Sequence, residues 1–216
     1  MTDIKITYRG KKDYPKKFEF LSDPPAKIYY KGKAFDESLK TAAIIGSRNC
    51  TEYGKKCAEY FAAALAKKNV AIVSGLAKGT DAYAHKAAIR ENGYTIGIIG
   101  SGIDITYPKE NEPLYNEIKE HGTILSEFPY GTPPLAQNFP KRNRLIAALS
   151  DIVIVIEAEK KSGSMITVSH ALNMGKDVFC VPGRINDKMS AGCLELISLG
   201  AYPLVCAENL FEALKV

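Results

Sequence analysis

Hydrophobic positions form short continuous runs that alternate with longer stretches of helical spacing from residue 41 to the C-terminus. The runs are rich in Val and Ile and lack the inside–outside alternation of a half-exposed strand. Continuous runs of this kind are typical of parallel strands buried on both faces. They predict strands at 42–45, 70–74, 95–99, 123–125, 151–156, 177–181 and 202–205.

The stretches between these runs carry recognisable helix ends. Thr51 can cap a helix that runs to about Lys68, and Asn111 can cap another helix that has Pro113 in its first turn. Gly175 stands where a left-handed residue commonly ends a helix. Alternating strands and helices require crossover connections, so we predict an α/β fold: a Rossmann-like, doubly wound, mostly parallel sheet with helices on both faces.

Residues 1–40 differ from the rest of the chain. They contain ten Lys and Arg against six Asp and Glu, three prolines, and one short strand candidate at 28–30. We expect them to form an N-terminal arm that packs on the sheet. Residues 1–216 are then expected to be a single Rossmann-like domain.

Composition bounds the class of protein. The 216 residues are 46% hydrophobic and 25% charged, as in a soluble globular protein, and the net charge of +5 is too small to indicate a partner. Five cysteines without a Cys-x-x-Cys pair argue against a disulfide framework or a thiolate zinc site. The start of the chain has no apolar signal segment, and the run at 152–156 is far short of the ~20 residues of a membrane helix. We therefore expect a soluble, cytoplasmic protein with no membrane partner.

The loops after the strands should carry the chemistry, because doubly wound sheets bind ligands at the carboxyl ends of their strands. The loop after the first parallel strand begins Gly46-Ser47-Arg48, which can hold an anion or be an ordinary turn. The next loop contains Ser74, Gly75 and Lys78 but lacks the Gly-Lys-Ser/Thr ending of a Walker P-loop. These loops predict anion binding at one sheet edge.

The helix that begins near Phe139 has an unusual charge pattern. Lys141, Arg142 and Arg144 occupy its first turns beside Asn143, although the positive end of a helix dipole disfavours cations there. An external anion over that helix start would remove the conflict, whereas a solvated basic face would tolerate it. Phe139 can stack on a base or belong to the core.

A third anion-competent turn, Ser162-Gly163-Ser164, precedes another helix, where a simple serine cap is the alternative. Asp81 and His85 lie one helical turn apart and are more often a local hydrogen-bonding pair than metal ligands. We expect no metal. No cofactor is expected either, because no stretch follows the dinucleotide order Gly-x-Gly-x-x-Gly. No catalytic constellation is evident, so nothing requires an enzyme.

Taken in order, these motifs closely resemble the DNA-processing protein A family (DprA, also called Smf) over nearly the whole chain. The pieces that carry the resemblance are colinear, and they are 14–15, 23–25, 44–48, 53–54, 72–81, 84–85, 100–104, 107–111, 125–127, 139–146, 162–164, 181–183 and 196–201.

The resemblance implies a homodimeric protein that binds single-stranded DNA, protects incoming strands and loads the RecA recombinase in natural transformation. It implies DNA contacts at Arg48, Lys109, Arg142 and Arg144, with Lys141, Asn143 and the 162–164 turn beside them. Leu194 stands where the family usually has Asn. Many members also carry an N-terminal helical domain and a C-terminal winged helix, neither of which we expect here.

Two other functions are compatible with this fold class. One is a nucleoside-monophosphate phosphoribohydrolase of the related lysine-decarboxylase-like superfamily, whose catalytic turn carries a Glu. No Asp or Glu lies between Glu159 and Asp177, so the obvious acid or base is missing. The other is a sensor that binds a nucleotide-like ligand in the same crevice.

Overall fold

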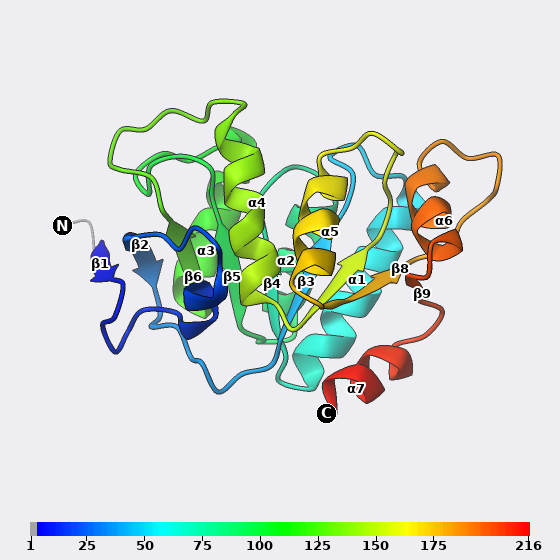
Figure 1. Ribbon diagram of the computed structural model, residues 1–216, viewed down its shortest axis with the longest axis horizontal. Helices are drawn as coiled ribbons and strands as arrows, with labels where there is room; N and C mark the ends of the chain where they lie inside the picture. Colours follow the sequence, from blue (N-terminus) through cyan, green and yellow to red (C-terminus); the bar gives the residue numbers. More distant parts are fainter. Residues whose placement is uncertain (1–3) are drawn as a thin grey trace.

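The structure is a computed structural model that describes residues 4–216. Within them one sheet contains nine strands (Figure 1). The strands are β1 (Lys5–Tyr8), β2 (Lys27–Gly32), β3 (Thr41–Ile45), β4 (Ala71–Ser74), β5 (Thr95–Ile98), β6 (Thr123–Ser126), β7 (Ile152–Val155), β8 (Asp177–Cys180) and β9 (Tyr202–Pro203). The helices are α1 (Glu52–Lys67), α2 (Thr80–Arg90), α3 (Glu112–His121), α4 (Asn138–Leu149), α5 (Ser164–Asn173), α6 (Ala191–Ser198) and α7 (Glu208–Leu214), with 3₁₀ helices η1 (Lys16–Phe20) and η2 (Lys109–Asn111).

The strand order is β1-β2-β6-β5-β4-β3-β7-β8-β9. From β6 to β9 in this spatial order, each strand is parallel to the next. The chain builds outward from β3 in one direction through β4, β5 and β6, and then returns to place β7 on the other side of β3. The predicted Rossmann-like fold is confirmed. A doubly wound sheet opens a crevice where the winding direction reverses, here between the carboxyl ends of β3 and β7.

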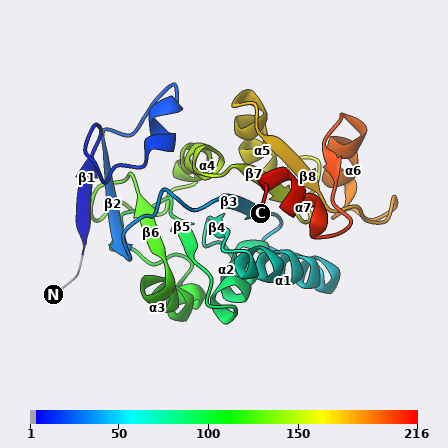
Figure 2. The same cartoon turned by 90° about the horizontal axis from the view of Figure 1, so that it is seen from below.

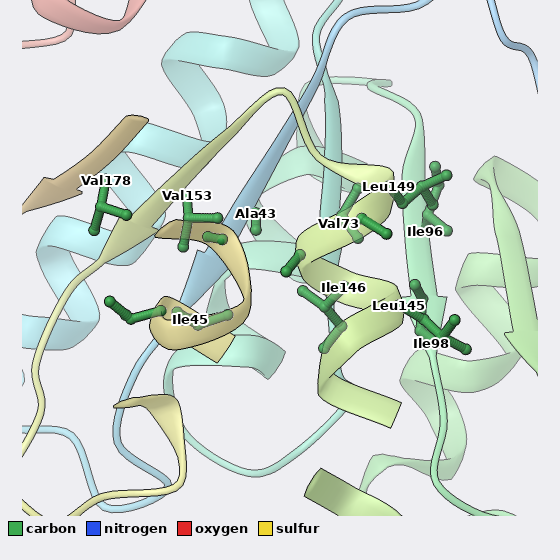
Figure 3. Close-up of a cluster of buried hydrophobic side chains, with 14 of the residues drawn as sticks. Ala43, Ile45, Val73, Ile96, Ile98, Leu145, Ile146, Leu149, Val153 and Val178 are labelled. Atoms are coloured by element: carbon green, nitrogen blue, oxygen red, sulfur yellow. The ribbon is translucent and has the colours of Figure 1, made fainter. Parts of the chain in front are cut away.

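Helices cover both faces of the sheet, as Figure 2 shows: α1, α2 and α3 lie on one face, and α4 and α5 on the other. Alternate residues of one strand serve the two layers. Ala43 and Ile45 pack in the cluster under α4 (Figure 3). Ala42 and Ile44 pack in the cluster under α1. Every residue of β3 is buried, which explains its continuous apolar run.

The three predicted helix ends are confirmed in position. The Thr51 side chain accepts a hydrogen bond from the backbone N–H of Gly54, and Gly175 has a left-handed φ of +67°. Asn111 stands at the N-cap position of α3, with Pro113 in the first turn as predicted, but its side chain makes no capping hydrogen bond. Its Nδ2 instead donates to the carbonyls of Leu76 and Ala77, at 2.9 and 3.1 Å, and so ties the start of α3 to the loop after β4.

The N-terminal arm extends the sheet and also packs on it. β2 pairs antiparallel with β6, and β1, which the sequence analysis missed, pairs antiparallel with β2. At the edge of the sheet, β1 buries only Thr7, so it has no apolar run to recognise. Tyr14 and Phe18 join the cluster under α4. At the other edge β9 is shorter than predicted, with two residues in place of four.

Candidate nucleic-acid interface

The predicted binding loops meet where the winding direction of the sheet reverses, at the carboxyl ends of β3 and β7. The loops after β3 and β7 and the starts of α4 and α5 surround a crevice with a volume of about 470 Å³ at the carboxyl edge of the sheet. Nine of the predicted residues line it: Gly46, Ser47, Arg48, Phe139, Arg142, Asn143, Ser162, Gly163 and Ser164. A smaller cavity of about 80 Å³ lies beside it and is lined by Gly75, Lys78, Arg48, Phe139 and Arg142, among others.

The loop that carries Arg48 is held from both sides. The backbone N–H of Thr80 donates to the Ser47 carbonyl at 3.1 Å, and the Ser164 hydroxyl donates to the Gly46 carbonyl at 2.9 Å. Gly79 has a φ of +73°, and a Cβ there would lie 2.5 Å from the Arg48 carbonyl oxygen. Only glycine permits this approach, so the loops after β3 and β4 form one rigid unit.

Arg48 is an open cation of the crevice. Its side chain is exposed, and its guanidinium carbon lies 5.3 Å from the centre of the Phe139 ring. Within residues 4–216 its guanidinium has no ion pair with a carboxylate, unlike Lys78 and Arg144. A fixed cation without an internal partner is available to an external phosphate.

Arg142 corrects the sequence analysis. Its side chain points inward and is 4% exposed, and its Nη1 donates to the carbonyls of Gly75, at 2.8 Å, and Ile98. Burial lowers the pKa of the Arg142 guanidinium, and nearby Asp81 opposes that shift. This cation therefore joins α4 to the ends of β4 and β5, where internal carbonyls and Asp81 balance its charge, although it also lines both cavities.

Arg144 also has an internal partner. Its guanidinium forms a two-pronged pair with Glu127, at 3.1 and 2.7 Å, and both side chains are only 14% exposed. Burial raises the pKa of Glu127, and Arg144 opposes that shift. Asp23 of the arm lies 3.8 Å away on the other side. The charge of Arg144 at the start of α4 is therefore balanced within the fold, by Glu127 from the loop after β6.

We expect Arg144→Ala to lower the free energy of unfolding by about 1–3 kcal/mol, because it leaves the largely buried Glu127 carboxylate unpaired. Urea denaturation measures this loss. The exposed pair of Lys78 and Glu110, also 2.7 Å apart, is the matched control, and Lys78→Ala should leave the unfolding midpoint almost unchanged. Equal midpoints for the Arg144 variant and the unsubstituted protein would contradict this role.

The remaining predicted residues divide by exposure. Lys109 and Lys141 are exposed at the same edge but do not line the two cavities. Lys78 is exposed and loosely held by Glu110. Ser74 is fully buried, and its hydroxyl donates to the Ile44 carbonyl at 2.7 Å, so it supports the strand end. Asn143 donates to the Gly163 carbonyl at 3.3 Å and thereby joins α4 to the turn before α5.

The turn before α5 is open to the crevice. Ser162, Gly163 and Ser164 all line it, and the Ser162 hydroxyl is buried without a hydrogen-bond partner among the described residues. Lys161 lines the crevice too and is exposed, yet the sequence analysis did not name it as a site residue. Its position just before a Ser-Gly-Ser helix start was the available signal. The turn adds backbone amides and a second cation opposite Arg48.

The Asp81 and His85 pair serves the fold. Asp81 Oδ2 accepts from the backbone amides of Gly75 and Ala77, at 3.0 and 3.3 Å. His85 is fully buried with its Nδ1 2.6 Å from the Thr95 hydroxyl, and burial lowers its pKa to about 3. The imidazole is therefore neutral at physiological pH. In residues 4–216 no group of three or more His, Cys, Asp or Glu side chains could hold a metal ion, and no helix is long and apolar enough to cross a membrane.

Comparison with known proteins places this site in a family. The family model described as DNA recombination-mediator protein A matches residues 5–215. The chain is 41% identical to DNA processing protein DprA of Bacillus subtilis, over 94% of this chain and 69% of that protein. It is 39% identical to Protein Smf of Synechocystis, over 94% of this chain and about half, 52%, of that protein.

Solved structures agree. DprA of Streptococcus pneumoniae superposes with a TM-score of 0.93 at 39% identity, over 97% of this chain and 74% of that chain. DprA of Helicobacter pylori, from a structure that describes its single-stranded DNA binding mode, superposes with a TM-score of 0.87 at 35% identity, over 99% of this chain and 96% of that chain. The crevice and the loops around it lie within residues 5–215, which the family model matches. By sequence and by structure, the chain belongs to the DNA recombination-mediator protein A family, which includes the DprA and Smf proteins.

Proposed function

We propose that this chain binds single-stranded DNA in the crevice at the carboxyl edge of the sheet, with little sequence preference. The observation that carries the proposal is Arg48, an exposed cation on a rigid loop without an internal acid. Lys161 and the turn before α5 line the same crevice and supply further groups for a phosphate. Lys141 and Lys109 extend the positive edge outside it.

The form of the crevice favours a single strand over a duplex. The phosphate groups of a duplex stand on a stiff helix, and its bases face inward. A single strand can bend into a recess and turn its bases toward the protein. The related H. pylori protein, whose structure describes single-stranded DNA binding, matches this chain over the same loops.

The buried arginines then act as supports. Arg142 fixes the start of α4 to the ends of β4 and β5, and Arg144, two residues later, fixes the helix to Glu127. The exposed Lys141 comes just before Arg142 in the sequence and is free to reach DNA. The family resemblance adds a cellular role: the protein protects incoming single strands and loads the RecA recombinase in the cytoplasm, as a homodimer.

The phosphoribohydrolase alternative is not favoured. Its catalytic turn needs a carboxylate, and the turn before α5 offers only serine hydroxyls and backbone amides. Glu159 lines the crevice, but Lys188 pairs with its carboxylate at 2.9 Å. The crevice is therefore better suited to hold a phosphate than to hydrolyse a nucleotide.

A titration of labelled oligothymidine against duplex DNA of equal length tests the proposed function. We expect the single strand to bind at least about tenfold more tightly, because only its bases are free to stack on the protein. Equal affinity for the duplex would contradict the proposal. Tight binding of a mononucleotide, with no gain as the oligonucleotide lengthens, would instead indicate a small-ligand pocket.

A further inference from the structure

Tyr107 presents an open aromatic ring beside the crevice. It lies in the loop between β5 and η2, at the same edge of the sheet as Arg48, and is 42% exposed. Its ring centre is 5.8 Å from that of Phe139, with an angle of 37° between the ring planes. The two rings thus form one apolar surface next to a cationic recess, although the sequence analysis selected only Phe139.

The surroundings of Phe139 are already occupied. The guanidinium carbons of Arg48 and Arg142 lie 5.3 and 5.8 Å from its ring centre. On the backbone side, a Cβ on Gly100 would lie 3.0 Å from Phe139 Cδ1, so the ring packs closely against that glycine. Phe139 therefore orients Arg48 through a cation–π contact. The more open of the two rings is that of Tyr107.

The backbone of Tyr107 is anchored by a buried hydroxyl. The Tyr115 hydroxyl donates to the Tyr107 carbonyl at 2.9 Å and accepts from the Tyr107 amide at 3.5 Å. Tyr115 is 6% exposed, and burial raises its pKa to about 12, so it remains a donor at physiological pH. Because its backbone is already held in place, Tyr107 loses less conformational freedom when a ligand stacks on its ring.

The cavity of about 80 Å³ connects Tyr107 to Arg48. Both residues line it, together with Lys78, Pro108 and Phe139. A base attached to a phosphate at Arg48 therefore lies within reach of the Tyr107 ring, which borders the same cavity.

We propose that Tyr107 stacks on a base of the bound single strand, while Phe139 holds Arg48 against the adjoining phosphate. The inference rests on the proposed function and adds the residue that recognises bases there. A stacked ring contacts the π-face that every base has, so this contact accepts any sequence. It also makes affinity depend on the presence of bases, which phosphate contacts alone would not do.

The test pairs two proteins with two ligands. The unsubstituted protein and Tyr107→Ala are titrated with oligothymidine and with an abasic oligonucleotide of the same length and charge. We expect Tyr107→Ala to bind oligothymidine about tenfold more weakly and the abasic strand with unchanged affinity. Tyr107→Phe keeps the ring and should retain the affinity for oligothymidine.

Tyr60 provides the control, since it is 54% exposed on α1 and lines neither cavity. Tyr60→Ala should bind both ligands like the unsubstituted protein. Equal losses of affinity for oligothymidine and the abasic strand in Tyr107→Ala would overturn the stacking role. Unchanged affinity of Tyr107→Ala for oligothymidine would also overturn the stacking role. If Arg48→Ala still weakens binding in that case, the proposed function stands. Failure of the unsubstituted protein to bind oligothymidine would overturn both.

Discussion

Arg142→Ala is expected to lower the free energy of unfolding by about 3–5 kcal/mol, the range found when one partner of a buried charged network is removed. The substitution leaves the carbonyls of Gly75 and Ile98 without their donor and the buried Asp81 without its neighbouring cation. It also opens a space between α4 and the ends of β4 and β5. Urea denaturation followed by circular dichroism measures the loss.

Lys141→Ala is the matched control, because Lys141 precedes Arg142 in the same helix but is exposed. Its unfolding midpoint should stay close to that of the unsubstituted protein. The two variants should therefore differ in what they change. Lys141→Ala should weaken DNA binding without lowering the free energy of unfolding, and Arg142→Ala should mainly lower the free energy of unfolding. An Arg142 variant that unfolds at the same urea concentration as the unsubstituted protein would show that its buried bonds contribute nothing.

Removing both open cations of the crevice should have the largest effect on DNA. Each charge-assisted contact contributes about 1.5 kcal/mol or more, so Arg48→Ala with Lys161→Ala should weaken oligothymidine binding about a hundredfold. The plot of log affinity against log salt concentration should become shallower by about 1.4, because each lost phosphate contact reduces the slope by about 0.7 on single strands. Fluorescence anisotropy across a salt series measures both quantities.

The control for this double variant is Lys67→Ala with Lys86→Ala. Both lysines are exposed on the helices of the other face of the sheet, α1 and α2, so the net charge changes equally while the crevice stays intact. This control should keep nearly the full affinity and the full salt slope. Equal losses in the two double variants would mean that DNA responds to the overall charge of the protein, and the crevice would lose its assignment.

Much of the fold was predictable from the sequence because its signals are local. The Val- and Ile-rich run of β7 is buried on both sides, and it predicted a parallel strand without any knowledge of its neighbours. The Thr51 cap likewise depends on a residue three positions away. β1 escaped notice because an edge strand buries few side chains. The position of Asn111 at the start of α3 was likewise predictable, but the partners of its side chain, Leu76 and Ala77, come from a distant loop and were not.

The basic start of α4 shows where sequence reasoning stopped. Phe139, Lys141, Arg142 and Arg144 look equivalent as a cluster, but a helix turns by about 100° per residue and points them in different directions. Lys141 therefore faces solvent, Arg142 enters the core, and Arg144 pairs with Glu127 from the loop after β6. The helix dipole argument counted cations near one terminus and could not count the internal partners that balance them.

The sequence by itself determined the fold class, the family and the edge of the sheet where the binding loops gather, because those follow from residue order and short-range pattern. Tertiary structure alone decided which cations are free. Gly79 lets the loop that carries Arg48 pack against the loop after β4, and Tyr115 holds the backbone of Tyr107 at the same edge of the sheet. Charge at a site depends on distances between residues far apart in the chain, and only folding sets those distances.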